Sequence, residues 1–363
     1  MIWSWRISLV ALCLTAALPV LAQNTDDLPS APSAVKQPKP TPPAPPPQPA
    51  PEVEQSEPAQ PAASATDLSD PRDKGDANAP LSDPNTIRVP VNEVNVVFTV
   101  TDKHNHYVKD LSKTDFKVVD DEHPVEEIRS FRRETDLPLQ VGLLIDASNS
   151  IRERFKFEQE SAIEFLNDTI RPRYDQAFVV GFDVAPELTQ DFTDNSEKLS
   201  RGIRALQPGN ATAMYDALYY SCRDKLLKSP QSSSVRRAII LVSDGDDNAS
   251  HVTREEAIEM ALRANTIVYT ISTNFPAGAD GDRYDKVLER IADATGGRAF
   301  RPFQLTDVAN AFAQIQDDLR SQYELSYHPA NFAHDGRYRT IAISATKKGL
   351  KVRSRTGYYA PGE

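Results

Sequence analysis

The sequence predicts an α/β fold, in which a doubly wound, mostly parallel sheet flanked by helices is joined to a β-sandwich-like unit. Between residues 136 and 321, short apolar strands alternate with amphipathic helices, which is typical of a parallel sheet covered on both faces. Strands such as Ala238–Val242 are apolar at every position, as expected when both faces are buried. The flanks, residues 87–135 and 322–361, show only strand patterns, and neither has enough strands for a stable sandwich alone. We therefore expect the two flanks to pack together.

The N-terminal part of the chain is expected to lie outside the fold. Residues 1–22 have a weakly basic start, an apolar stretch of about 15 residues and small residues before Gln23, as in a secretory signal peptide. The alternative is an uncleaved N-terminal anchor, although a membrane span needs about 20 apolar residues. Residues 23–86 hold more than half of the 28 prolines and are expected to form a disordered linker. The alternative for this segment is a ligand for a proline-binding partner.

The flanks contain alternating or β-branched stretches that predict strands. Their expected ranges are 91–101, 111–121 and 125–131 before the α/β unit, and 323–327, 338–344 and 351–355 after it. Lys351, Arg353 and Arg355 alternate along the last strand, and we expect them to form a solvated face.

Along residues 136–321, apolar runs typical of buried strands alternate with segments in which apolar residues recur at helical spacing, which predicts the α/β unit. Strands are expected at 139–145, 177–182, 235–243, 267–272 and 298–300, with a short extended segment at 187–192. Helices are expected at 154–170, 196–206, 213–227, 253–264, 284–294 and 306–321. Thr253 and Glu256 form a capping-box pattern at the start of one of these helices.

Charge and cysteine content exclude some functions. The formal net charge of −11 argues against nucleic acid as a partner, because binding a phosphate backbone requires a basic surface. Removal of residues 1–22 would leave Cys222 as the single remaining cysteine, so we expect no disulfide within the chain. We expect Cys222 to be a buried thiol on a helix.

Oxygen-rich side chains follow three of the predicted elements. Asp146, Ser148 and Ser150 alternate directly after an apolar strand, so in an extended loop they face one side. Thr212 stands before a helix, and Asp244 follows the strongest strand. Each has a plain structural alternative, since the first and second could cap helices and the third could form a turn. Because ligands gather at the carboxyl ends of strands in a doubly wound sheet, the three together indicate one site.

The chain resembles the von Willebrand factor type A domain and its metal-ion-dependent adhesion site, whose pattern is Asp-x-Ser-x-Ser, a distant Thr and a distant Asp. Asp146-Ala-Ser148-Asn-Ser150, Thr212 and Asp244 match this pattern without a departure. The flanks, with the closing Arg-Thr-Gly357-Tyr-Tyr-Ala, are similar to secreted bacterial proteins that carry the domain. The resemblance implies an adhesion or scaffold module rather than an enzyme.

The expected cofactor is Mg²⁺, with Mn²⁺ or Ca²⁺ as alternatives, because the donors are all oxygen atoms. Two carboxylates and three hydroxyls leave such an ion short of ligands, so an Asp or Glu of a partner protein is the expected last one. The expected location is secreted or periplasmic, with membrane contact only if the N-terminal segment stays uncleaved. Two alternatives remain, a metal-dependent hydrolase or phosphatase and a structural envelope protein with a vestigial metal site. The six histidines show no metal-ligand spacing, and no nucleophile stands beside a base in the sequence.

Overall fold

The computed structural model describes residues 93–133, 137–148, 155–229, 235–274, 279–304, 306–331 and 333–362. The expected signal peptide, the whole expected linker and the expected flank residues before Glu93 lie outside this part of the chain. Ser150, one of the expected metal ligands, also lies outside the described residues.

A six-stranded sheet with the order β10-β9-β8-β5-β6-β7 forms the centre of the α/β unit. All neighbouring strands from β10 to β6 pair in parallel, and the edge strand β7 pairs antiparallel to β6. The mostly parallel sheet that the sequence predicts is therefore confirmed. The strands are β5 (Leu139–Asp146), β6 (Gln176–Phe182), β7 (Pro186–Thr193), β8 (Arg236–Ser243), β9 (Thr266–Ser272) and β10 (Ala299–Phe300).

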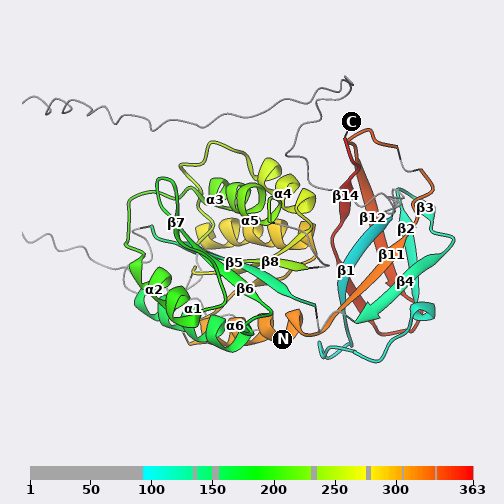
Figure 1. The fold of residues 1–363 in the computed structure, drawn as a ribbon, viewed down its shortest axis with the longest axis horizontal. Coiled ribbons are helices and arrows are strands. Elements are labelled where there is room, and N and C mark those ends of the chain that lie inside the picture. The colour runs from blue at the N-terminus through cyan, green and yellow to red at the C-terminus, as the bar shows by residue number, and fades with distance from the viewer. Residues whose placement is uncertain are drawn as a thin grey trace, which may run out of the picture. The chain divides into compact units, whose positions relative to one another are not determined.

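Helices cover both faces of this sheet, as Figure 1 shows. One face packs against α1, α2 and α6, and β5 contributes Leu143 and Ile145 to that core. The other face packs against α3, α4 and α5, and receives Leu144 from the same strand. The apolar run at the end of β5 is thus buried on both sides, because successive side chains point to opposite faces. The helices are α1 (Phe155–Thr169), α2 (Ser196–Ala205), α3 (Met214–Tyr220), α4 (Arg254–Arg263), α5 (Ala279–Thr295) and α6 (Asp307–Leu319).

Several local predictions are confirmed in detail. Helix α3 continues as a π-helical segment, Ser221–Leu226, in which Cys222 is a buried free thiol. Thr253 and Glu256 form the expected capping box at the start of α4. Helix α5 begins earlier than the sequence pattern indicates, at Ala279.

The two flanks form a sandwich of two four-stranded sheets, with the orders β13-β1-β11-β4 and β14-β12-β2-β3. Each sheet contains strands from both flanks, so the sandwich predicted in the fold class is confirmed. In the first sheet β1 pairs antiparallel with β11, placing Val96 opposite Leu325. The strands are β1 (Val94–Thr101), β2 (Phe116–Asp120), β3 (His123–Pro124), β4 (Ile128–Arg133), β11 (Gln322–Tyr327), β12 (Tyr338–Ala345), β13 (Lys351–Ser354) and β14 (Gly357–Tyr359).

An aromatic cluster fills the core of the sandwich and joins residues from both flanks. The ring of Phe98 lies 5.0 Å from that of Phe116 and 5.6 Å from that of Tyr323, measured between ring centroids. Phe131 also stacks on Tyr323 at 5.3 Å and lies 6.5 Å from Phe98. Such ring pairs add about 0.5–1.5 kcal/mol each to the area that they bury. The α/β unit is therefore inserted between two halves of one sandwich core.

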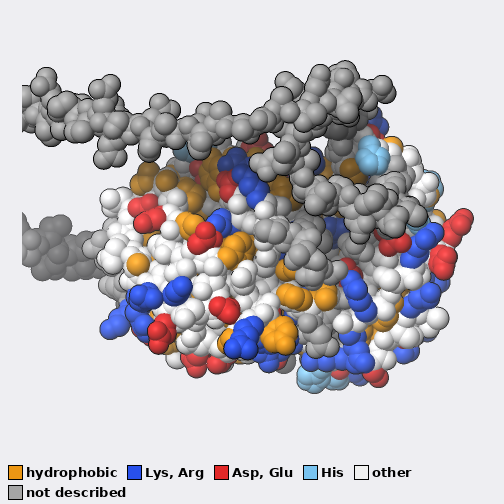
Figure 2. Space-filling view, in the orientation of Figure 1, with side chains coloured by type: hydrophobic (Ala, Val, Ile, Leu, Met, Phe, Trp, Pro, Cys, Tyr) orange, Lys and Arg blue, Asp and Glu red, His pale blue; other side chains and the backbone are white. Residues whose placement is uncertain are grey.

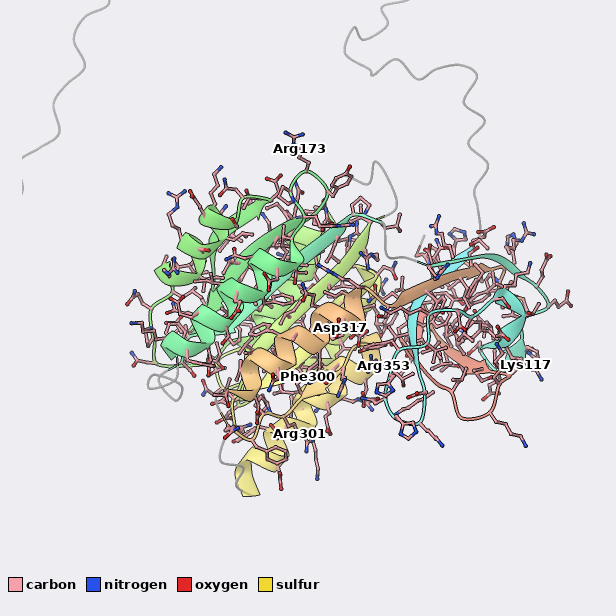
Figure 3. All side chains as sticks on the ribbon, turned by 90° about the horizontal axis from the view of Figure 1, so that it is seen from below. Lys117, Arg173, Phe300, Arg301, Asp317 and Arg353 are labelled. Carbon is pink, nitrogen blue, oxygen red and sulfur yellow. The ribbon has the colours of Figure 1, made fainter. Side chains whose placement is uncertain are left out.

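The strand β13 contradicts one prediction, because its alternating cations are not a solvated face. Lys351 is exposed, but the guanidinium of Arg353 contacts the buried carboxylate of Asp318 on α6. Figure 3 shows Arg353 beside α6, between this helix and the sandwich. Arg355 donates to the Asn265 side chain at 2.8 Å. Lys351 and Arg353 alternate along β13 and Arg355 follows its end, and the α/β unit contacts Arg353 and Arg355 but leaves Lys351 exposed.

Two further features of the described residues are the distribution of surface charge and the hydropathy of the helices. Acidic and basic side chains are interspersed over the face shown in Figure 2. Among the described residues, no helix combines the length and the hydropathy that a membrane crossing requires.

Candidate metal site

The carboxyl ends of the parallel strands meet at one edge of the six-stranded sheet. Strand β5 ends at Asp146 and the adjacent β8 ends at Ser243, with Ile145 paired to Val242 one position earlier. Arg301 follows β10 and marks the same edge in Figure 3, where Arg173, in the turn before β6, lies at the opposite end of the α/β unit. The loops after β5 and β8 are therefore neighbours in space although nearly a hundred residues separate them.

Asp146 is fully buried, and the protein fixes its carboxylate in place. Its Oδ1 accepts a hydrogen bond of 2.8 Å from the backbone N–H of Ser148, which turns the chain after the strand. Its Oδ2 accepts a hydrogen bond of 2.6 Å from the hydroxyl of Ser243. Each carboxylate oxygen has a second lone pair, so both can still face a cation or a water bound to one.

The electrostatics at Asp146 disfavour its charge in the absence of a cation. The pKa of Asp146 is raised to about 6, mainly by burial and also by the nearby carboxylate of Asp244, while the hydrogen bonds from Ser243 and Ser148 oppose the rise. Two carboxylates that repel each other at a buried edge gain stability when a divalent cation binds between or beside them.

Thr212 reaches this edge because its loop is fixed to the loop of Asp146. The N–H of Gly209 donates to the carbonyl of Ala147 at 2.5 Å. A Cβ on Gly209 would lie 1.9 Å from Oδ2 of Asp183, so the close approach requires glycine. Thr212 itself is buried and stands just before α3.

The loop after β8 holds Thr212 from its other side. Asn248 Oδ1 accepts from the N–H of Thr212 at 3.0 Å, and the carbonyl of Thr212 accepts from the N–H groups of Asn248 and Ala249. Asp247 Oδ2 accepts from the N–H of Tyr215 at 2.9 Å, in the first turn of α3. These contacts cap the start of α3 with side chains of another loop and join the loops of Thr212 and Asp244 into one unit.

Hydrogen bonds to both its backbone and its side chain hold Asp244. Its carbonyl accepts from the side-chain amide of Asn274 at 2.7 Å, and its Oδ1 accepts from the N–H of Asp246 at 3.1 Å. The following Gly245 has a φ of 81°, in the left-handed region where glycine is favoured.

Four of the five expected ligands therefore lie at the end of β5 or on loops at this one edge: Asp146, Ser148, Thr212 and Asp244. Whether they bind a metal stays a prediction, as does the role of Ser150. Within the described residues, no group of three or more His, Cys, Asp or Glu side chains could hold a metal ion. The donors present are carboxylate and hydroxyl oxygens, which fit a hard divalent cation.

Ser243, Asn248 and Asn274 were not predicted from the sequence, and each forms a hydrogen bond to one of the candidate ligands. The polar run Ser243-Asp-Gly-Asp-Asp-Asn248 after an apolar strand is the signal that could have revealed two of them.

Comparison with known proteins agrees with this architecture. The model of the von Willebrand factor type A domain family matches residues 141–246. Calcium-activated chloride channel regulator 1 of Bos taurus is 28% identical over 181 residues, which are 48% of this chain and 19% of that protein. The chain thus spans about a fifth of the length of that relative.

Solved structures with a similar fold include proximal thread matrix protein 1 from the mussel byssus, with 13% identity and a TM-score of 0.43, covering 61% of this chain and 50% of that one. A further structure of the mussel protein is described as having a zinc-occupied MIDAS motif, with 16% identity and a TM-score of 0.44, covering 54% of this chain and 48% of that one. The type V pili tip protein Mfa5 of Porphyromonas gingivalis shows 16% identity and a TM-score of 0.41, covering 50% of this chain and 94% of that one. The match of the family model thus assigns residues 141–246, which lie in the six-stranded α/β unit, to the von Willebrand factor type A domain.

Proposed function

We propose that this chain is a metal-dependent protein-binding module that acts outside the cytoplasm, as an adhesion or scaffold protein. The observation that carries the proposal is the fully buried carboxylate of Asp146, placed beside Asp244 at the carboxyl edge of a parallel sheet. Von Willebrand factor type A domains are protein-interaction modules, and the matched segment contains Asp146, Ser148, Thr212 and Asp244.

In this proposal Asp146 and Asp244 supply negative charge to the ion, and Ser148, Ser150 and Thr212 supply neutral oxygen ligands. Mg²⁺ is the first choice, with Mn²⁺ or Ca²⁺ as alternatives, because all the donors are hard oxygen atoms. When bound, the ion acts as a Lewis acid that attracts one more negatively charged oxygen.

The partner that fits such a site is a protein that presents an Asp or Glu side chain. Mg²⁺ prefers six oxygen ligands, and two protein carboxylates leave part of its coordination and charge unsatisfied. A carboxylate of the partner supplies both. The hydrogen bonds to Asp146 from Ser148 and Ser243 keep its oxygens in position before the partner arrives, which lowers the entropic cost of binding.

The location outside the cytoplasm rests on residues 1–22, whose pattern is that of a secretory signal. The proline-rich residues 23–86 would then serve as a spacer between an attachment point and the binding domain.

Calorimetric titration of the full chain with MgCl₂ tests the metal site, and a pull-down from an envelope extract with and without EDTA tests the partner. We expect one Mg²⁺ per chain, and a partner that is retained with Mg²⁺ and released by EDTA. Asp146→Ala should abolish both Mg²⁺ binding and partner binding. The control Asp191→Asn changes a carboxylate on β7 that pairs with Lys225, and it should keep both. Partner binding that survives both EDTA and Asp146→Ala would refute the proposal. A chain that binds Mg²⁺ and also hydrolyses phosphate esters would favour the enzyme alternative instead.

A further inference from the structure

Two buried pairs of a serine and a carboxylate lie side by side at the carboxyl edge of the six-stranded sheet. Ser243, at the end of β8, is paired in register with Ser272, at the end of β9. The hydroxyl of Ser243 donates to Oδ2 of Asp146 at 2.6 Å. The hydroxyl of Ser272 donates to Oδ1 of Asp285 at 2.5 Å. Asp285 belongs to α5 and is 4% exposed, so the second pair repeats the first one strand further along the sheet.

The two serines also hold the backbone that follows them in the same way. The oxygen of Ser243 accepts from the N–H of Gly245 at 3.0 Å. The oxygen of Ser272 accepts from the N–H of Asn274 at 3.1 Å. Each hydroxyl therefore joins a buried carboxylate to the chain two residues after its strand. The carboxylate of the first pair is a candidate metal ligand, and the second carboxylate, that of Asp285, is placed to act on the same edge.

Asp285 has a cation of the protein beside it. Nε of Arg301, which follows β10, lies 3.5 Å from Oδ2 of Asp285. Figure 3 shows Arg301 at this edge. A buried carboxylate normally has such a partner, so the charge of Asp285 needs no metal to balance it. Among the described residues no three His, Cys, Asp or Glu side chains could hold one ion, so Asp285 is not a third carboxylate ligand beside Asp146 and Asp244.

Asp285 reaches the candidate site through the side-chain amide of Asn274. Nδ2 of Asn274 donates to Oδ1 of Asp285 at 3.0 Å and to the carbonyl of Asp244 at 2.7 Å. The NH₂ group has two hydrogens, and both have an acceptor here. Because an ionised carboxylate can only accept hydrogen bonds, Asp285 decides which end of the amide faces it. The NH₂ group is thereby presented to the carbonyl of Asp244.

Helix α5 also contacts the loop of Asp244 directly. A Cβ on Gly245 would lie 2.9 Å from the carbonyl oxygen of Tyr284, the residue before Asp285 in the helix. Gly245 therefore packs against the backbone of α5, with no room for a side chain. The candidate ligand is thus held to α5 in two ways, by this close approach and by the amide that Asp285 orients.

We propose that Asp285 is a positioning residue of the metal site, which fixes the main chain of Asp244 through Asn274. Ser272 and Arg301 keep its carboxylate in place, and Asp285 itself does not touch the ion. The inference rests on the proposed function, because it gives Asp285 a part in binding the same ion. Without this carboxylate the amide of Asn274 can turn, and the loop of Asp244 loses its support on the side of β9.

Calorimetric titration of the full chain with MgCl₂ measures the effect on the site. Loss of a group that orients a metal ligand typically costs about 10–100-fold in affinity, and we expect Asp285→Asn to weaken Mg²⁺ binding about 10-fold. The matched control is Asp175→Asn, in the turn before β6 at the opposite edge of the sheet. Asp175 is also buried, accepts from the N–H of Leu139 at 2.9 Å and pairs with Arg171 at 2.8 Å. This control should lose stability and keep its Mg²⁺ affinity.

A cycle of single and double variants separates positioning from a general loss of structure. Asn274→Ala alone should weaken Mg²⁺ binding by a similar factor, and adding Asp285→Asn should cause no further loss, because the carboxylate acts through the amide. Losses that multiply in the double variant would overturn the inference. If Asp285→Asn does not fold, Ser272→Ala replaces it, since this hydroxyl joins the same carboxylate to Asn274. Ser272→Ala should also weaken Mg²⁺ binding.

Amide hydrogen exchange of the metal-free chain distinguishes a failure of this inference from a failure of the proposed function. The N–H groups of Gly245 and Asp246 are hydrogen-bonded within the loop of Asp244. Both should exchange faster in Asp285→Asn and at the original rate in Asp175→Asn. An unaltered chain that binds no Mg²⁺ would refute the proposed function, and the exchange rates would still decide whether Asp285 holds this loop. Unchanged exchange, or an unchanged Mg²⁺ affinity where the unaltered chain binds the ion, would overturn the inference.

Discussion

Ser243, the last residue of β8, donates a hydrogen bond of 2.6 Å from its hydroxyl to Oδ2 of Asp146, the last residue of β5. Both side chains are fully buried. The same Ser243 oxygen accepts from the N–H of Gly245 at 3.0 Å, so one hydroxyl joins the carboxylate to the turn that follows Asp244. The two loops that carry the acidic residues of the candidate site are therefore held to each other by a residue that is not itself a candidate ligand.

Ser243→Ala tests this relationship. Loss of a group that orients a metal ligand typically costs about 10–100-fold in metal affinity, and we expect a decrease in that range. Oδ2 of Asp146 would also lose a buried hydrogen bond, which should lower the free energy of unfolding by about 1–3 kcal/mol. Calorimetric titration with Mg²⁺ and denaturant unfolding measure the two effects.

The matched control is Ser130→Ala, because the hydroxyl of Ser130 also forms a partly buried hydrogen bond, at 2.7 Å to Ser326 in the sandwich. This control should lower stability without changing Mg²⁺ affinity. An unchanged affinity in Ser243→Ala would mean that Asp146 does not need this contact to bind metal.

A second residue of this kind is Asn248, whose Oδ1 accepts from the N–H of Thr212 at 3.0 Å. Asn248→Ala should let the loop of Thr212 move relative to that of Asp244, and we expect Mg²⁺ to bind about 10-fold more weakly. Asn195→Ala provides the control, because Oδ1 of Asn195 accepts a backbone N–H in the same way at the start of α2, also at 3.0 Å. Both variants should lose similar stability, about 0.5–2 kcal/mol, but Asn195→Ala should bind Mg²⁺ normally. Equal Mg²⁺ affinities in the two variants would contradict the bracing role.

The sequence predicted the sheet and the edge of the candidate site because both depend on local patterns. The apolar run before Asp146 identifies a buried strand, and the carboxyl ends of parallel strands must share an edge. Period-two alternation likewise placed Lys351 and Arg353 on one face of β13.

Other features were not predictable because they depend on contacts between distant segments. Alternation says which side chains share a face but not what covers it, so the contact of Arg353 with Asp318 was missed. The contacts of Ser243 with Asp146 and of Asn248 with Thr212 cross between loops, and their geometry follows from strand order rather than from spacing along the chain. The sequence alone does not fix that order.

Asp216 should make stability depend on pH at the acidic end. Burial alone would raise the pKa of its carboxyl, but hydrogen bonds from the His251 ring and from the N–H groups of Val252 and His251 outweigh burial and lower it below 3.8. A carboxyl with a lower pKa in the folded state stabilises the fold above its unfolded pKa, and this contribution is lost as pH falls through the folded value. Asp216→Asn should therefore destabilise the protein at pH 7 and lose less stability than the unaltered chain between about pH 5 and pH 2. Urea unfolding at a series of pH values measures this, and parallel pH profiles for the two proteins would contradict it.

The contact between Asp318 and Arg353 should decide how firmly the sandwich is attached to the α/β unit. Asp318 is buried, and besides Arg353 its carboxylate accepts from the hydroxyls of Tyr107 at 2.9 Å and Tyr269 at 3.1 Å. Arg353 and Tyr107 belong to the sandwich and Tyr269 to β9, so one carboxylate of α6 joins both parts of the fold. Removing one member of a buried ion pair leaves the other charge without compensation, which typically costs about 3–5 kcal/mol.

We therefore expect Arg353→Met to lower the free energy of unfolding by that amount, and the double variant Arg353→Met with Asp318→Asn to recover part of it, because the unpaired charge is then absent. Arg204→Met is the comparison, since its pair with Glu160 is exposed and should contribute at most about 1 kcal/mol. Calorimetry of the three variants separates the cases. If the double variant is less stable than Arg353→Met alone, the uncompensated charge is not the cause, and the packing of the arginine stem against the junction would account for the loss instead.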